Sequence, residues 1–304
     1  MNAMFLAALV DTIVAPVHNE IYVHEWGVMS YRAGVAEAAG VPDDSSFYDQ
    51  SDDCAEAPVI HIWGPEFDGT LTVRSPGRIV SAWPEPDEQF DLDAGIAGGG
   101  SAVRWSGFDT ICPYSIEEIP WSPASSIPGF GWAVYLWRMP DCLVIRRWSD
   151  RFYDKFFYYE VEFPGRTSPL PLETGSGTAP EDSWNGDVLV FTRDDRGGVS
   201  LEILTSTDLE RPREESLPSG RLFSREAVLD KLEEWAGSLL KPVEIEEMWS
   251  TWEPYVTGGD WEGPRLVLFP LPSTCVERIS TLELTDAEGR PVYYNRFFLG
   301  MTEI

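Results

Sequence analysis

The residue types best suited to chemistry gather near the start of this sequence. His24, Glu25 and Trp26 are consecutive, and His61 lies in a similar run of β-branched and aromatic residues. Imidazole and carboxylate groups serve as general acids or bases and as metal ligands. A metal-dependent hydrolase needs about three such ligands around an open coordination position. His24 and His61 are therefore candidate metal ligands, with Glu25 beside them, whereas His18 lies outside both runs and makes a poor third ligand.

The pattern around His24 restricts this chemistry. Residues 20–31 alternate in the manner of a strand, with His24 and Trp26 on one face and Glu25 on the other. Because neighbouring residues on a strand point to opposite faces, His24 and Glu25 cannot bind one metal ion unless the chain bends. Gly27 is the residue suited to a bulge or to a close backbone approach. We therefore interpret this stretch as the first core strand.

Other catalytic signatures are missing or unspecific. The sequence has no Gly-x-Ser-x-Gly motif, and no cysteine is singled out beside a histidine. A glycoside hydrolase needs two carboxylates beside a sugar cleft, and the 51 acidic residues supply many candidates without selecting any. A metal-dependent or glycoside hydrolase, using the region of His24 and His61 or paired carboxylates, is the alternative hypothesis for the function.

A second candidate metal site lies in an acidic segment, residues 43–56, which is rich in carboxylates. Asp49, Asp52 and Asp53 are its candidate ligands, because Ca²⁺ prefers carboxylate oxygens. The spacing of an EF-hand loop is absent, so the motif does not select calcium strongly. A solvated loop is the other interpretation of the same residues.

The charge balance argues against two classes of partner. The chain has 22 basic and 51 acidic residues, which give a net charge of −29. Nucleic acids and anionic membrane surfaces both attract clusters of Lys and Arg, so neither is an expected partner. No apolar run approaches the roughly 20 residues that a membrane-spanning helix requires, so membrane insertion is not expected.

The first nineteen residues carry an ambiguous targeting signal. An apolar run at residues 4–10 is similar to the apolar region of an export signal, but Asp11 follows it and no positive charge precedes it. We interpret residues 1–19 as a degenerate export signal or as an N-terminal extension. Four widely spaced cysteines permit two disulfides in any of three pairings, or buried free thiols.

Strand patterns dominate the first half of the chain. Short β-branched and aromatic runs at about ten-residue spacing, separated by Gly and Pro, predict a β-sandwich-like domain over residues 20–164. Residues 131–138 are one of the predicted strands. The segment 165–185 is rich in Pro, Gly, Ser and Thr, and is therefore the predicted linker.

The remaining residues predict a smaller α+β domain over 186–304, so the expected fold class is mainly β. Two short helices should lie on its sheet. Ser224 is the predicted N-cap of the first helix, which ends before Pro242, and the second helix should occupy residues 243–253.

Seven short segments also occur in a recognisable order: His24–Gly27, Ala57–Ile62, Val80–Pro84, Arg104–Trp105, Lys155–Tyr159, Pro169–Leu172 and Gly263–Phe269. Together they resemble a family of exported bacterial proteins of uncharacterised activity, known from planctomycetes and myxobacteria, with a His-Glu-Trp-Gly segment near the start of the mature chain. The resemblance implies export and a β-rich fold, and it implies no activity. A histidine of the family pattern corresponds to Trp132 here, so a metal site that used it would be incomplete.

The function predicted from these features is binding or structural. We expect an acidic, β-rich protein that is extracellular, periplasmic or on the cell surface, with a carbohydrate, a surface polymer or a protein as its ligand. Trp121 and Trp184 lie in loops rich in Pro, Ser and Gly, and are the candidate ligand-binding residues. The other interpretation of both residues is that they anchor their loops.

Overall fold

The strands of this protein form two β-sheets, and helices cover one of them. The fold is a computed structural model that describes residues 19–31, 54–92, 100–115, 117–123, 127, 129–163, 170–174, 182–194, 196–209, 221–258 and 261–304. The predicted export signal falls outside these residues except for its last position, residue 19. In the described part of the chain, no helix has both the length and the apolar character needed to cross a bilayer.

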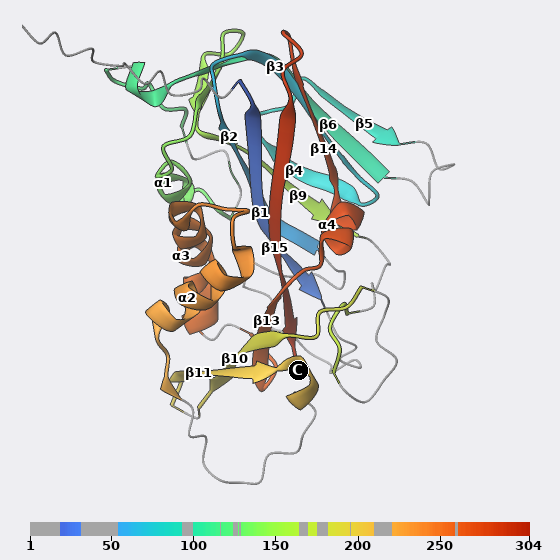
Figure 1. Cartoon of the computed structure of the whole chain (residues 1–304), viewed down its shortest axis with the longest axis vertical. Coiled ribbons are helices and arrows are strands. Elements are labelled where there is room, and N and C mark those ends of the chain that lie inside the picture. Colours follow the sequence, from blue (N-terminus) through green and yellow to red (C-terminus); the bar gives the residue numbers. More distant parts are fainter. Residues whose placement is uncertain are drawn as a thin grey trace, which may run out of the picture.

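The larger sheet has nine strands and runs through the middle of the molecule (Figure 1). From one edge to the other its strands are β12 (Arg221–Leu222), β11 (Val199–Thr205), β10 (Asp187–Arg193), β13 (Arg265–Pro270), β15 (Val292–Glu303), β1 (Ile21–Tyr31), β2 (Cys54–Trp63), β9 (Phe156–Glu162) and β4 (Arg78–Trp83). The hairpin of β10 and β11 is antiparallel, as the Gly-containing turn between them requires.

The smaller sheet packs against one face of the larger one. Its strands are β14 (Thr281–Asp286), β3 (Asp68–Ser75), β6 (Gly100–Ile111), β7 (Val144–Arg147) and β8 (Phe152–Asp154), with β5 (Glu88–Leu92) paired to β6. Trp105 and Phe108 of β6 contact Phe157 of β9, with ring centroids 4.9 Å and 5.1 Å apart. Interlocked side chains from two sheets are the core of a sandwich, so the prediction of a mainly β fold is confirmed.

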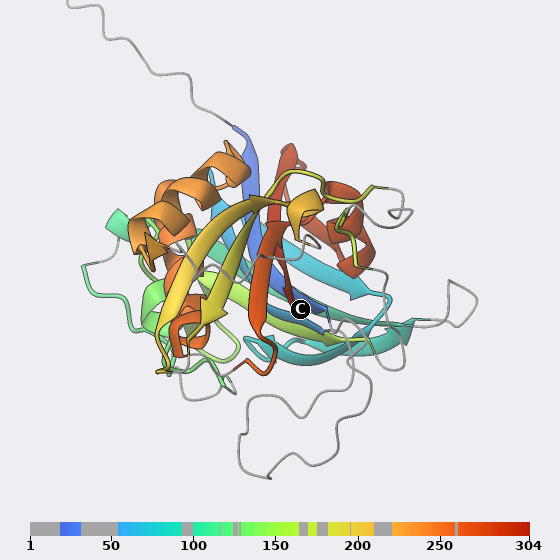
Figure 2. The ribbon, with the colours of Figure 1, turned by 90° about the horizontal axis from the view of Figure 1, so that it is seen from below.

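Helices cover the opposite face of the nine-stranded sheet. They are α1 (Val134–Trp137), α2 (Arg225–Ala236) and α3 (Pro242–Gly258), whereas α4 (Ser273–Ile279) lies beside β15; two 3-10 turns are η1 (Pro113–Ser115) and η3 (Ser206–Asp208). Figure 2 shows α2 and α3 on one side of the central strands and the second sheet on the other. Ser224 caps α2 by accepting a hydrogen bond from the amide of Ala227, as predicted.

The prediction of a strand at residues 131–138 was wrong. The segment forms a turn and the short helix α1. Val134, Leu136 and Trp137 are buried, and the indole of Trp137 packs edge-on against Trp26 at a centroid distance of 6.2 Å. Burial on one side of a helical turn therefore overrides the strand propensity of these β-branched and aromatic residues.

The last strand joins the two predicted halves of the chain. β15 pairs in parallel with β1 over the whole length of β1, and it pairs with β13 on its other side. The predicted linker at 165–185 therefore separates strands that share one sheet. Successive side chains of β1 point to opposite faces of the sheet, so alternate residues face the helices and the residues between them face the second sheet.

Gly27 marks a bulge in the pairing of β1 with β2, as its position in the sequence predicted. It is paired with Phe298 of β15, whose buried ring lies over it. A Cβ atom at Gly27 would lie 2.6 Å from Cε1 of Phe298, which is inside van der Waals contact.

Replacing Gly27 by Ala should therefore lower the free energy of unfolding by about 1–3 kcal/mol, the usual cost of overpacking a core. Urea denaturation followed by tryptophan fluorescence measures this change. As a control, Thr281→Ala removes an exposed side chain from β14, and its effect should stay within about 0.5 kcal/mol. Equal stability of the two variants would contradict the close packing at Gly27.

Candidate functional site

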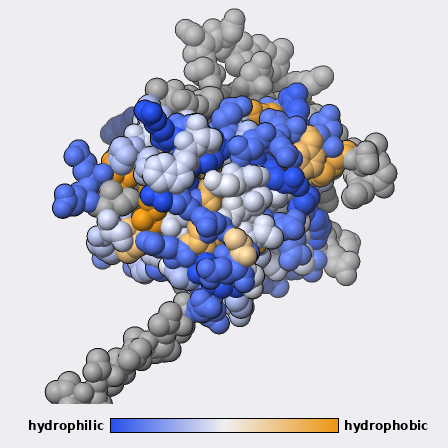
Figure 3. Space-filling view, turned by 90° about the horizontal axis from the view of Figure 1, so that it is seen from above, coloured by the Kyte–Doolittle hydropathy of each residue, from blue (hydrophilic) through white to orange (hydrophobic). Residues whose placement is uncertain are grey.

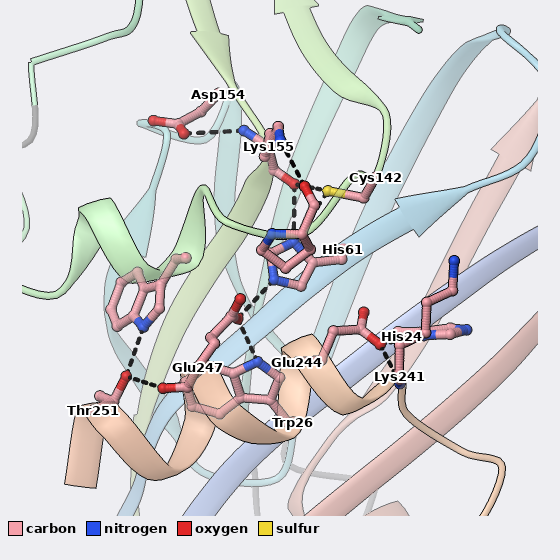
Figure 4. A network of polar contacts seen from close by, with 12 residues as sticks. His24, Trp26, His61, Cys142, Asp154, Lys155, Lys241, Glu244, Glu247 and Thr251 are labelled. Carbon is pink, nitrogen blue, oxygen red and sulfur yellow. Dashed lines mark hydrogen bonds and ion pairs between the residues drawn. The ribbon is translucent and has the colours of Figure 1, made fainter. Parts of the chain in front are cut away.

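The pairing of β1 with β2 brings the two candidate histidines together. His24 and His61 are opposite each other in the register, and Trp26 lies two residues along on the same face. This face carries α3, so these side chains point toward the helix (Figure 4). His24 is 6% exposed and His61 is fully buried. The predicted shared face of His24 and Trp26 is confirmed.

Helix α3 supplies one carboxylate to each histidine. Glu244 and Glu247 are three residues apart and so lie on one side of the helix, and both are fully buried. His24 Nδ1 lies 2.8 Å from Glu244 Oε2, and His61 Nε2 lies 2.7 Å from Glu247 Oε1. The indole of Trp26 donates a further hydrogen bond of 2.7 Å to Glu247 Oε1. We call these five residues the His–Glu network.

His61 is the protonated member of the network. Its Nδ1 lies 3.1 Å from the backbone carbonyl oxygen of Lys155, and a carbonyl oxygen can only accept a hydrogen bond. Its Nε2 faces Oε1 of Glu247, which also accepts a hydrogen bond from the indole of Trp26. Both ring nitrogens therefore donate. Burial alone would lower the pKa of His61, but the Glu247 carboxylate and the nearby Cys142 raise it well above its usual value.

His24 has the opposite arrangement of donors and acceptors. Its Nδ1 donates to Glu244, while its Nε2 lies 3.2 Å from the amide nitrogen of Asn295 and accepts from it. Glu244 and Asn295 together fix the orientation of this imidazole ring. Burial acts to raise the pKa of Glu244, but the hydrogen bond from His24, the positive charge of His61 and the backbone amide of Lys241 keep it below its usual value.

Glu244 also ties the start of α3 to the sheet. It accepts hydrogen bonds from the indole of Trp63, at 3.0 Å, and from the backbone amide of Lys241, at 2.7 Å. The ammonium of Lys241 in turn lies 3.0 Å from the centre of the Trp63 ring. All the carboxylate oxygens of the network thus face donors or the protein interior, and none is presented to solvent.

Glu25 belongs to a separate polar cluster on the other face of β1. It pairs with Arg296 of β15 and accepts a hydrogen bond of 2.6 Å from the hydroxyl of Tyr159. Arg296 and Tyr159 both contact Ser280, at the end of α4. His24 and Glu25 therefore lie on opposite faces of β1, as expected. His24 faces α3, and Glu25 faces the second sheet.

The predicted metal ligands do not form a complete site in the described part of the chain. Within those residues, no three side chains of His, Cys, Asp or Glu converge in a way that could hold a metal ion. His24 and His61 each use a nitrogen on a glutamate instead. Asp49, Asp52 and Asp53, the candidate calcium ligands, lie outside the described residues.

The two candidate tryptophans have different surroundings. Trp121 is 37% exposed, and the guanidinium of Arg138 covers one face of its ring. Trp184 is half-buried: its indole donates to the carbonyl of Asp187 at 2.8 Å, and its ring packs edge-on against Trp235. Trp184 thus has the contacts of a loop anchor, whereas Trp121 presents surface to solvent.

Exposed aromatic side chains concentrate in one segment of the chain. Eleven large hydrophobic residues are exposed in the described part, and six of them fall within residues 114–148: Tyr114, Trp121, Trp132, Tyr135, Met139 and Trp148. We call residues 114–148 the aromatic segment. Sequence reasoning selected only Trp121 from it; Trp132 and Tyr135 occur in a run that predicts a strand.

The three cysteines whose side chains the structure describes are free thiols. Cys142 and Cys275 are buried and Cys112 is half-buried. Cys142 contacts the His–Glu network, because its Sγ lies 3.5 Å from His61 Nδ1. No disulfide joins these three residues.

Comparison with known proteins leaves the chain without an assigned family. A scan against protein-family models, a search of curated proteins and a search of solved structures each gave no match. Its function is therefore inferred from its own residues.

Replacing Glu247 by Gln tests the charge pair with His61. The raised pKa of folded His61 makes its contribution to stability complete below pH 6.5, the value of an ordinary histidine, and this contribution is lost as the pH rises toward the folded pKa. Burial raises the pKa of Glu247, so its carboxylate becomes protonated at a higher pH than an ordinary glutamate does. Glu247→Gln should therefore cost about 3–5 kcal/mol of unfolding free energy just below pH 6.5, and less in more acidic solution. The cost should shrink as the pH rises above 6.5.

Urea denaturation at a series of pH values measures both the cost and its pH dependence. Glu246→Gln is the matched control, because Glu246 is exposed on the same helix. This control should change stability by less than about 0.5 kcal/mol at every pH. A pH-independent cost for Glu247→Gln would show that His61 is neutral in the folded chain.

Proposed function

We propose that this protein is a binding module whose aromatic segment recognises a carbohydrate polymer, in an exported or cell-surface setting. The proposal is supported chiefly by the concentration of exposed aromatic rings in the aromatic segment. Exposed apolar residues that gather in one region mark an interaction site more often than scattered ones do. A sugar ring offers an apolar C–H face that stacks on an indole or a phenol ring.

The helical turn at α1 illustrates how the rings are displayed. Trp132 and Tyr135 are 44% and 66% exposed, and their spacing of three residues places them on one side of the turn. The residues between and after them are buried against the sheet and α3. The indole of Trp137, for example, donates to Thr251 on α3 at 3.0 Å. A ring on a fixed turn loses little conformational freedom when it binds a ligand.

A carbohydrate fits this surface better than a protein partner does. Protein interfaces have contiguous apolar centres from which charged residues are depleted. In the aromatic segment, charged side chains such as Arg138 and Arg146 alternate with the exposed rings. The end of the molecule seen in Figure 3 is likewise mostly hydrophilic, with small separated hydrophobic groups. Separate rings with polar neighbours suit a chain of sugar units.

The hydrolase hypothesis finds little to support it in the described residues. Glu244 and Glu247 are the paired carboxylates nearest to His24 and His61, and both have no exposed surface. A glycosidase needs two carboxylates on either side of a bound sugar. Glu244 and Glu247 are buried between α3 and the sheet, so no sugar can lie between them. We therefore assign the His–Glu network a structural role.

The double variant Trp132→Ala/Tyr135→Ala tests the proposed function. The purified chain should be retarded in native gels that contain at least one soluble polysaccharide from a panel of neutral, basic and acidic polymers. The double variant should lose roughly tenfold or more in affinity, because two rigid aromatic contacts are removed.

Matched controls are Tyr293→Ala and Ile203→Ala, which remove exposed side chains outside the aromatic segment. Both controls should bind the polysaccharide as the wild type does. Absence of retardation by every polymer in the panel would overturn the proposal, and so would equal losses in the controls and the double variant.

A further inference from the structure

Beyond α3, the helix-covered face of the nine-stranded sheet carries three aromatic side chains in a row. In Figure 1 the starts of β1 and β15 extend past α3. Tyr22 of β1 is directly opposite Tyr293 of β15 on one side and Trp63 of β2 on the other. Since Tyr22 is two residues from His24, the three rings lie on the same face of the sheet as the His–Glu network.

The two tyrosines form a pair with a carboxylate at its edge. Their ring centres are 5.4 Å apart and their planes are 25° from parallel. Tyr293 is 46% exposed, and Tyr22 is half-buried beside it. The hydroxyl of Tyr22 donates a hydrogen bond of 2.6 Å to Oε2 of Glu20. Within the described residues, Glu20 pairs with no Lys, Arg or His.

The third ring already carries a cation from the protein itself. Nζ of Lys241 lies 3.0 Å from the ring centre of Trp63, and the indole of Trp63 donates a hydrogen bond of 3.0 Å to the buried Glu244. A ring, a cation and a carboxylate therefore occur together at Trp63. The tyrosine pair with Glu20 offers the ring and the carboxylate, and the structure shows no cation on it among the described residues.

Elsewhere the chain completes the same combination with arginine. The Cζ atom of Arg146 lies 4.2 Å from the ring centre of Trp148, and its guanidinium pairs with Asp109. Arg138 likewise lies over Trp121 and pairs with a buried aspartate. A planar guanidinium can stack on a ring while its N–H groups bind a carboxylate, and an ammonium group lacks that shape.

The charges select a cationic partner for the tyrosine pair. The net charge of −29 attracts cations at long range and repels anions. A partner that covers both tyrosines also removes water from Glu20, which is half-buried beside them. Burying this carboxylate without an opposite charge would cost free energy, so the partner must bring a positive group to Glu20.

We infer that Tyr22, Tyr293 and Glu20 form a binding site for an arginine side chain of a partner polypeptide. The apolar stem of the arginine lies along the tyrosine rings, and its guanidinium binds the carboxylate of Glu20. The site is separate from the aromatic segment, so this inference does not depend on the proposed function.

The choice of arginine is tested by fluorescence anisotropy with a labelled peptide of alternating glycine and arginine. A glycine–lysine peptide of the same length and charge is the comparison. In about 0.15 M salt, charges more than about 8 Å apart are largely screened. The arginine peptide should then bind roughly threefold or more tightly than the lysine peptide, because its guanidinium groups can stack and bind a carboxylate together. Equal binding of the two peptides would show that the site does not select arginine.

Variants of the site test its residues. Tyr293→Ala should weaken binding of the arginine peptide roughly fivefold or more, and it leaves the net charge unchanged. Tyr293→Phe keeps the ring and should retain most of the affinity. Glu20→Gln should weaken binding by a similar factor. Its matched control is Glu233→Gln, which removes the same charge from an exposed position on α2 and should have little effect.

Thermal melting of every variant checks folding, and Tyr293→Phe and Glu20→Gln keep the test valid if Tyr293→Ala is destabilised. Unchanged binding in both Tyr293→Ala and Glu20→Gln would overturn the inference. Equal losses in Glu20→Gln and Glu233→Gln would also overturn it, because the attraction would then be unspecific. The site variants should bind polysaccharide as the wild type does, and loss of polysaccharide binding through Trp132→Ala/Tyr135→Ala should leave the arginine peptide bound. The two proposals therefore fail separately.

Discussion

The burial of an imidazolium–carboxylate pair between His61 and Glu247 constrains the rest of this structure. Removing two charges from water costs several kcal/mol for each ion, and hydrogen bonds to the buried groups offset part of that cost. The carbonyl of Lys155 and the indole of Trp26 supply such bonds here, whereas Oε2 of Glu247 is buried with no hydrogen-bond partner among the described residues. Because the contributing groups come from β1, β2, α3 and the residue before β9, the pair forms in one arrangement of these elements.

β1 makes buried polar contacts on both faces of the central sheet. His24 and Trp26 face α3, while Glu25 between them reaches Tyr159 and Arg296 on the side of the second sheet. A one-residue slip of β1 would exchange these two polar sets and leave each facing the wrong partners. Since β1 also pairs with β15, near the end of the chain, its register fixes the first and last parts of the sequence together.

Local pattern was enough to predict the strand character of β1, the bulge at Gly27 and the Ser224 cap, because each depends on residues within a few positions. It could not identify Glu244 or Glu247 as partners of the histidines. Two glutamates are inconspicuous among 51 acidic residues. Their partners lie about two hundred residues away, 220 positions for His24 and 186 for His61. The same limit applies to the parallel pairing of β1 with β15, and to α1, where burial decided between a strand and a helix.

The closed network and the exposed aromatic segment are connected through α3. The hydroxyl of Thr251 donates to the backbone carbonyl of Glu247 at 2.9 Å and accepts from the indole of Trp137. Trp137 also packs against Trp26, so the inner side of α1 rests on the same residues that bury the charge pair. With its inner side fixed, the turn must present Trp132 and Tyr135 outward. His24 and His61 thus have a structural role: they fix α3 and β1, against which the inner side of α1 packs while Trp132 and Tyr135 stay exposed.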